Sequence, residues 1–158
     1  MKIRPVTTED RPKVSALLQQ AFPGSRYEKQ LVENLHKKER TLHEWMCIIR
    51  NKVVAYIAYS NAYTEHRVCG LHLAPLAVNP EFQNRGIGSE LLRFSLRRKE
   101  IKENTVFVVG ALHFYEKFGF TPCTNPRYPF TAGNEHFLSI RNTTDNTVTV
   151  GYEPEFTK

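Results

Sequence analysis

Two glycines stand directly behind a Gln-Asn-Arg triplet in the segment NPEFQNRGIGSELLRFSLRR, residues 79–98. The apolar residues that follow predict a helix beginning at these glycines, and the first turn of a helix presents unpaired N–H groups. The positive end of the helix dipole lies there too, and glycine lets an anion approach without meeting a Cβ. Residues 83–88 therefore predict a phosphate cradle, although a strand-to-helix turn without a ligand would have the same composition.

Other phosphate motifs are absent around these glycines. The segment has no GxGxxG with an acidic residue about 20 positions on, so it is not a dinucleotide fingerprint. No GK[ST] follows, which excludes a Walker loop. The apolar spacing predicts that a cluster of basic residues lies on the same helix. Such a cluster indicates either a solvated helix face or a positive electrostatic field that attracts a polyanionic small molecule. We favour the second interpretation; the cluster is Arg93, Arg97, Arg98, Lys99 and Lys102.

The helices and strands that must position this segment are predicted to follow one another in the order β α α β β β α β α β β. Apolar residues at helical spacing predict helices at 7–22, 27–38, 86–102 and 111–118. Period-two or short apolar runs predict strands at 1–6, 43–49, 53–60, 68–78, 105–109, 135–141 and 147–152, with a tight turn at Asn51-Lys52. Pro75 lies inside one strand and has no N–H, so we expect that strand to be broken, bulged or splayed there.

Composition limits the possible classes of protein. The 158 residues are 41% hydrophobic and 24% charged with a net charge of +6, which predicts a single mixed α/β domain over 1–158. No apolar run reaches the roughly 18 residues of a membrane span, and the charged start predicts no signal peptide. Cys47, Cys69 and Cys123 lack metal-ligand spacing and predict free thiols, no metal site and a cytoplasmic location. The sequence has no basic stripe with interleaved aromatic residues, so we expect no nucleic-acid partner.

A second motif, FYEKFGF at residues 114–120, follows the glycine segment about 25 residues later. Together, in this order, LAVNPEFQNRGIGSELL and FYEKFGF resemble the Gcn5-related N-acetyltransferase (GNAT) superfamily. GALHFYEKFGF and the terminal VGYEPEF further resemble a small bacterial branch of predicted acetyltransferases. The resemblance covers most of the chain and implies a mixed sheet whose central strands splay apart.

The resemblance implies acetyl-CoA as cosubstrate, with its diphosphate on the N–H groups of residues 85–89. The pantetheine arm would pair with the strand before the loop, like an added strand. The implied cofactor-binding residues are Leu76, Ala77, Val78, Gln83, Asn84, Arg85, Gly86, Ile87, Gly88 and Ser89. Val108 takes the place of an asparagine that contacts the cofactor in many relatives, so that contact has no equivalent residue here.

Two residues are candidates for the chemistry. Tyr115 matches the family tyrosine that gives a proton or hydrogen bond to the CoA sulfur, and otherwise would be a core tyrosine. His72 lies where some relatives carry a base glutamate, and an imidazole with a pKa near ~6.5 suits proton removal from an ammonium group. A satisfied, partly buried histidine is an equally good interpretation of His72, because many relatives use only water.

The acceptor is the least defined part of the prediction. Glu28 could meet a cationic acceptor or only stabilise a helix start, and Tyr128 and Phe130 could line an acceptor pocket. We expect a small-molecule or peptide amine as acceptor and a monomer or homodimer. The alternative function is a non-catalytic CoA-binding sensor or subunit.

Overall fold

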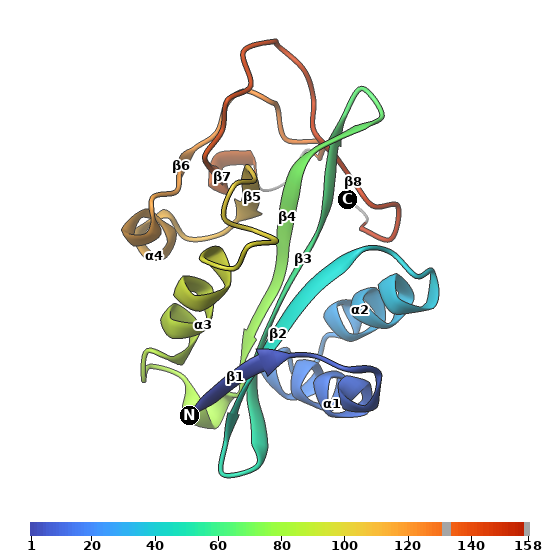
Figure 1. The fold of residues 1–158 in the computed structure, drawn as a ribbon, viewed down its shortest axis with the longest axis vertical. Coiled ribbons are helices and arrows are strands. Elements are labelled where there is room, and N and C mark those ends of the chain that lie inside the picture. Colours follow the sequence, from blue (N-terminus) through green and yellow to red (C-terminus); the bar gives the residue numbers. More distant parts are fainter. Residues whose placement is uncertain (131–133, 157–158) are drawn as a thin grey trace. The chain divides into compact units, whose positions relative to one another are not determined.

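The computed structural model describes residues 1–130 and 134–156. The chain forms a mixed α/β fold around a sheet with parallel and antiparallel strands, which confirms the predicted fold class (Figure 1). Two compact units divide it: residues 1–59 with 74–98, and residues 60–73 with 99–158. That the whole chain acts as one domain stays a prediction.

The first unit has the strand order β1-β2-β3-β4. Its elements are β1 (Lys2–Pro5), α1 (Arg11–Ala21), α2 (Tyr27–Lys37), β2 (Leu42–Ile49), the first part of β3 (Lys52–Thr64), the last part of β4 (Arg67–Val78) and α3 (Ile87–Leu96). Helices α1 and α2 lie on one side of these strands and α3 on the other (Figure 1).

Alternate residues of β3 face the two helical layers, as the period of a strand requires. Tyr56 and Ala58 join Ala77 of β4 in a buried cluster with Val14, Leu17 and Leu18 of α1 and Val32 of α2. On the opposite face the buried Tyr59 hydroxyl lies 2.6 Å from Ser95 Oγ of α3. The strands therefore pack against α3 on one face and against α1 and α2 on the other.

A buried carboxylate fixes the 3-10 turn Thr8–Asp10, which leads into α1. Asp10 accepts hydrogen bonds from the Thr7 amide and hydroxyl at 2.8 Å, in a capping box. Two Arg4 nitrogens donate to the same carboxylate at 2.8 and 2.9 Å. The hydrogen bonds from Arg4, and next those from Thr7, hold the pKa of Asp10 well below its ordinary value of 3.8.

We expect Asp10→Asn to be less stable than the wild type at pH 7. A carboxylate with a lowered pKa stabilises the fold above its ordinary value of 3.8 and loses that effect as the pH falls through its folded pKa. The difference between the two proteins should therefore shrink below about pH 4 in urea-unfolding series. A difference that stays constant with pH would contradict the assigned ion pair.

The second unit has the strand order β3-β4-β5-β7-β6, and β8 pairs with β3. Its further elements are β5 (Val106–Val109), α4 (Leu112–Tyr115), β6 (Thr121–Pro122), β7 (Phe137–Ile140) and β8 (Gly151–Tyr152). A parallel pairing joins Leu71 and His72 of β4 to Val106 and Phe107 of β5. The buried cluster of this unit is Ala62, Phe107, Cys123, Phe137 and Val150.

Several predicted boundaries are wrong. Helix α3 ends at Leu96 instead of reaching residue 102, because charged residues occupy the positions where its apolar face would continue. The β2–β3 turn is Arg50-Asn51, one residue earlier than predicted, and both residues have positive φ. Of the three alternatives at Pro75, a break is wrong, because β4 continues to Val78 through a cis Ala74–Pro75 bond. The pairing of β4 with β5 covers only Leu71 and His72, as the splayed alternative expects.

The strands predicted late in the chain are shorter than expected, and β6 was not predicted. Strand β7 begins at Phe137, after a 3-10 turn at Asn134–His136, and only Gly151–Tyr152 of the segment 147–152 pairs with β3. Two-residue strands such as β6 leave no period in the sequence, so only tertiary pairing reveals them.

Candidate functional site

A buried asparagine fixes the chain where β4 ends. Asn79 is 3% exposed, and its amide donates to the Val54 carbonyl oxygen at 2.8 Å. Its side-chain nitrogen donates to Gln20 Oε1 at 3.2 Å, and its side-chain oxygen accepts from the Glu81 amide at 2.9 Å. Sequence reasoning missed this residue, although the Asn-Pro dipeptide is a known turn signal.

The loop that follows turns through two left-handed residues. Asn84 has φ 63° and Gly86 has φ 79°, conformations that asparagine and glycine adopt most readily. Gln83 folds back, and its side-chain nitrogen donates to the Val78 carbonyl oxygen at 3.1 Å. The loop thus returns to the end of β4 and directs the chain into α3.

The backbone N–H groups in the first turn of α3 point out of the N-terminal end of the helix. The Glu90 amide donates to the Gly86 carbonyl oxygen at 3.0 Å and is the first to bond in the helical pattern. In the described part of the chain, the amides of Ile87, Gly88 and Ser89 donate to no backbone carbonyl, as helix geometry dictates. Gly86, next to them, is exposed, and that these donors act as a phosphate cradle stays a prediction.

The two glycines are present for different reasons. Gly86 needs glycine for its positive φ, and a Cβ there would have no heavy atom within 4 Å. Gly88 has ordinary helical geometry, and a Cβ there would meet only Val78 Cγ2, at 3.4 Å, which is normal contact. Glycine inside a helix costs about 1 kcal/mol relative to alanine. The backbone conformation therefore accounts for Gly86, whereas neither conformation nor packing accounts for Gly88, as expected where a ligand approaches.

The residues predicted to meet pantetheine alternate along the end of β4. Ala77 is buried in the cluster beneath α1 and α2. Leu76 and Val78 are half-buried and point to the opposite face by the period of the strand. Ala77 can therefore offer a ligand only its backbone, whereas Leu76 and Val78 can offer side chains as well.

Tyr115 is 8% exposed at the end of α4 in the second unit. Its ring packs edge-on against Phe114 and Phe120, at centroid distances of 4.9 and 5.4 Å. A Cβ on Gly110 would lie 2.3 Å from Tyr115 Cε2, so only glycine leaves room for the ring. Burial raises the pKa of Tyr115 to about 12, which keeps the phenol protonated and able to donate a hydrogen bond.

His72 is 6% exposed and surrounded by aromatic rings. It stacks on Tyr152 at a centroid distance of 3.6 Å, with an interplanar angle of 4°, and Phe156 meets it at 4.4 Å. Among the described residues its Nδ1 has no hydrogen-bond partner. Burial lowers the pKa of His72 to about 3, so the imidazole is neutral at physiological pH and is a weak base.

This burial predicts an acid-sensitive fold. The unfolded chain takes up a proton on His72 below its ordinary pKa of 6.5, whereas the folded chain does not until about pH 3. Stability is therefore complete above pH 6.5 and falls by about 1.4 kcal/mol per pH unit below it. In urea unfolding at a series of pH values, His72→Gln should lose this slope. An unchanged slope between pH 6 and 4 would mean that His72 is not buried in its neutral form.

The residues predicted to contact an acceptor lie in different units. Glu28 accepts a hydrogen bond from Ser25 Oγ at 2.8 Å at the start of α2, an arrangement that helix stabilisation alone explains. In the second unit the rings of Tyr128 and Phe130 lie 5.5 Å apart, and Phe130 lies 6.1 Å from Tyr152. Both aromatics thus belong to the layer of rings that contains His72, and their role toward an acceptor stays a prediction.

The basic cluster is not confined to one helix, which corrects the prediction. Only Arg93 lies within α3, and it donates to Glu90 at 2.7 Å. Arg98 stacks over Phe94 at 4.2 Å, beyond the end of the helix. Among the described residues, no cluster of three His, Cys, Asp or Glu side chains could hold a metal ion. No helix there is long and apolar enough to cross a bilayer, and all three cysteines are free thiols.

Comparisons with known proteins agree with this fold. Residues 40–122 match the model of the acetyltransferase (GNAT) domain. The chain is 31% identical over 122 residues to the uncharacterized N-acetyltransferase YjhQ of Escherichia coli (strain K12), covering 72% of this chain and 67% of the relative.

Two solved structures have the same fold at lower identity. The Escherichia coli GNAT family N-acetyltransferase YhbS, in complex with CoA, has a TM-score of 0.87 at 22% identity, covering 98% of this chain and 90% of that one. A GNAT family acetyltransferase of Brucella melitensis, in complex with acetyl-CoA, has a TM-score of 0.82 at 21% identity, covering 99% and 97%. The chain belongs to the GNAT acetyltransferase family.

Proposed function

We propose that this protein transfers the acetyl group of acetyl-CoA to a primary amine, by direct attack of the amine within a ternary complex. The observation that carries this proposal is the set of amides at residues 87–89, which have no backbone partner in the described residues and include Gly88, a glycine that neither conformation nor packing requires. They lie within the stretch that matches the GNAT model.

The cradle would hold the diphosphate of acetyl-CoA. Residues 85–89 would bind it through backbone amides, aided by the Arg85 guanidinium and the dipole of α3. The pantetheine arm would pair with the backbone of Leu76, Ala77 and Val78. Two solved relatives of this fold are complexes with CoA and acetyl-CoA, which supports the choice of ligand.

The reaction forms one bond and breaks another at the acetyl carbon. The neutral amine nitrogen attacks that carbon, the C–N bond forms, and negative charge develops on the carbonyl oxygen. The C–S bond then breaks, the sulfur leaves with the electron pair, and the nitrogen loses a proton. Groups that stabilise charge as it develops contribute most to such a step.

Tyr115 would donate a hydrogen bond to the departing sulfur. Its pKa of about 12 lies above the ordinary thiol value of ~8.5, so complete transfer of its proton would be uphill by about 5 kcal/mol. A hydrogen bond that strengthens as negative charge collects on the sulfur avoids that cost. The proton released by the nitrogen balances the thiolate charge.

Proton removal from the amine would proceed through water in this proposal. His72 is the alternative base, but an imidazole with a pKa of about 3 has little affinity for a proton from an ammonium group. The acceptor would be a small-molecule or peptide amine, next to Tyr128 and Phe130. We also infer that the protein acts in the cytoplasm, which the three free thiols support, and that it is a monomer or homodimer.

A thiol-release assay tests the proposal. Purified protein is incubated with acetyl-CoA and a panel of primary amines, including amino acids, polyamines, aminoglycosides and peptides, and free CoA is measured. At least one amine should raise thiol release above hydrolysis, with an acetylated product of matching mass. Tight acetyl-CoA binding with no turnover on any amine would instead indicate a CoA-binding module.

A further inference from the structure

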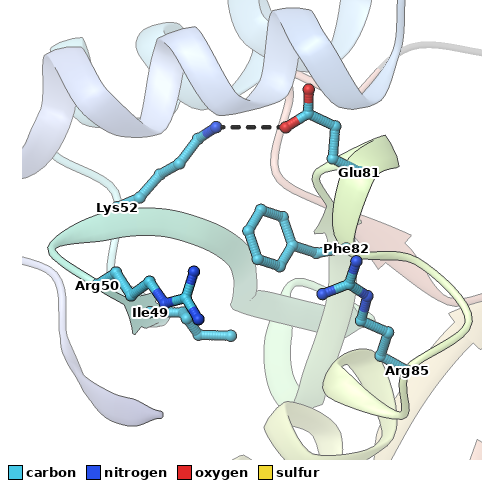
Figure 2. Close-up of a pocket in the computed structure, with 6 residues that line it drawn as sticks. All are labelled: Ile49, Arg50, Lys52, Glu81, Phe82 and Arg85. Atoms are coloured by element: carbon cyan, nitrogen blue, oxygen red, sulfur yellow. Dashed lines mark ion pairs between the residues drawn. The ribbon is translucent and has the colours of Figure 1, made fainter.

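A basic pocket of about 390 Å³ opens beside the cradle, within the first unit (Figure 2). It is lined by the β2–β3 turn on one side and by the segment after β4 on the other. Three cationic side chains and a single carboxylate line it. The lining residues are Ile49, Arg50, Lys52, Glu81, Phe82 and Arg85.

The backbone places Arg50 here at an energetic cost. Arg50 and Asn51 form a two-residue hairpin turn, with φ values of 51° and 63°. Turns of this kind prefer Asn-Gly, because non-glycine residues are strained at positive φ. Arginine in the first position is therefore not explained by turn preference, and in Figure 2 its guanidinium lies beside the pocket. Among the described residues Arg50 has no carboxylate partner.

The remaining charges are arranged around one aromatic ring. Lys52 Nζ lies 5.7 Å and the Arg85 guanidinium carbon 5.1 Å from the centre of the Phe82 ring, within cation–π range. Lys52 also lies 3.6 Å from Glu81, whose side chain is 76% exposed. An exposed pair of this kind contributes little, so the pocket keeps a net positive charge and three groups able to bind an anion.

Arg85 links the pocket to the cradle. Its side chain lines the pocket, while its backbone begins the stretch 85–89 that leads into α3. A ligand that placed one phosphorylated group on the amides could therefore place a second in the pocket. Guanidinium groups match phosphate oxygens with paired donors, and the dianion of a phosphate monoester would meet cations from two segments.

We propose that this pocket binds the 3′-phosphate at the nucleotide end of CoA and makes the protein prefer CoA to dephospho-CoA, which lacks that group. The inference rests on the proposed function, because it takes the diphosphate in the cradle as given. Arg50 and Lys52 are then specificity-determining residues, contributed by a turn that carries no part of the glycine motif.

The test compares two ligands by calorimetry, CoA and dephospho-CoA, on the whole protein. The wild type should bind CoA at least tenfold more tightly. Arg50→Ala should weaken CoA binding roughly tenfold, the scale of one charge-assisted hydrogen bond, and leave dephospho-CoA binding within about twofold. Glu81→Gln should increase the preference for CoA, because it removes the only carboxylate of the pocket.

Lys13→Ala is the matched control, since Lys13 is an exposed cation on α1 outside the pocket. It should change neither affinity. A wild type without preference, or an Arg50→Ala variant that loses both ligands equally, overturns the inference while leaving the proposed function intact. A wild type that binds neither ligand overturns both.

Discussion

Gly88→Asp is expected to weaken acetyl-CoA binding at least about a hundredfold, because like charges brought together at a ligand site cost several kcal/mol. Gly88 lies in the first turn of α3, beside the amides proposed to hold the diphosphate. An aspartate there would put its carboxylate against the ligand and could itself accept hydrogen bonds from those amides. Calorimetry with acetyl-CoA measures the loss directly.

Two variants at the same position separate the causes. Gly88→Ala adds only a Cβ that meets Val78 Cγ2 at 3.4 Å, so the fold should tolerate it and any loss of binding reports on the ligand's closeness. Gly88→Asn has the size of aspartate without the charge and should bind acetyl-CoA better than Gly88→Asp. Equal binding by the wild type and all three variants, with unchanged melting temperatures, would remove the cradle.

Tyr115→Phe is expected to lower kcat by about 10²–10³-fold, the usual loss when one donor to a developing charge is removed. The ring and its packing against Phe114 and Phe120 remain, so acetyl-CoA affinity should change little. Steady-state kinetics on an amine found by the thiol-release assay, together with calorimetry, measure both quantities. Normal turnover in the phenylalanine variant would end the assigned role.

Gly110→Ala provides a second approach to the same hydroxyl. The added Cβ would overlap Tyr115 Cε2 at 2.3 Å and force the ring to move, so turnover should fall although the hydroxyl is still present. Combined with Tyr115→Phe, Gly110→Ala should cause little further loss in kcat, because no hydroxyl is left to displace. Additive losses would mean that Gly110 acts on the reaction by another route.

The proposed phosphate cradle could be located in the sequence because its physics is local. A strand end, glycines and a helix start lie within one short stretch, so the spacing of Gly86 and Gly88 was enough to indicate amides facing a ligand. The family motif around Tyr115 was equally local. What the motif could not give was the protonation behaviour of Tyr115 and His72, since burial depends on residues brought together by the fold.

The features that were missed depend on contacts between distant segments. Asn79 is tied to Gln20 and Val54, which are far from it in the sequence. The pocket joins the β2–β3 turn to Phe82 and Arg85, and no periodicity links those segments. Pro75 was expected to break, bulge or splay β4; the strand continues past it, because the missing N–H removes one donor without preventing an extended backbone, while the pairing with β5 ends at His72.

The anchoring of Asn79 has a kinetic consequence. Because its three hydrogen bonds fix the start of the loop when the chain folds, the entropy of shaping that segment is lost before any ligand arrives. Under the proposed function, we expect cofactor capture to need no slow ordering step. We then expect the rate of cofactor binding to be set by diffusion through the positive field of Arg50, Lys52 and Arg85, and therefore to fall as the ionic strength of the solution rises.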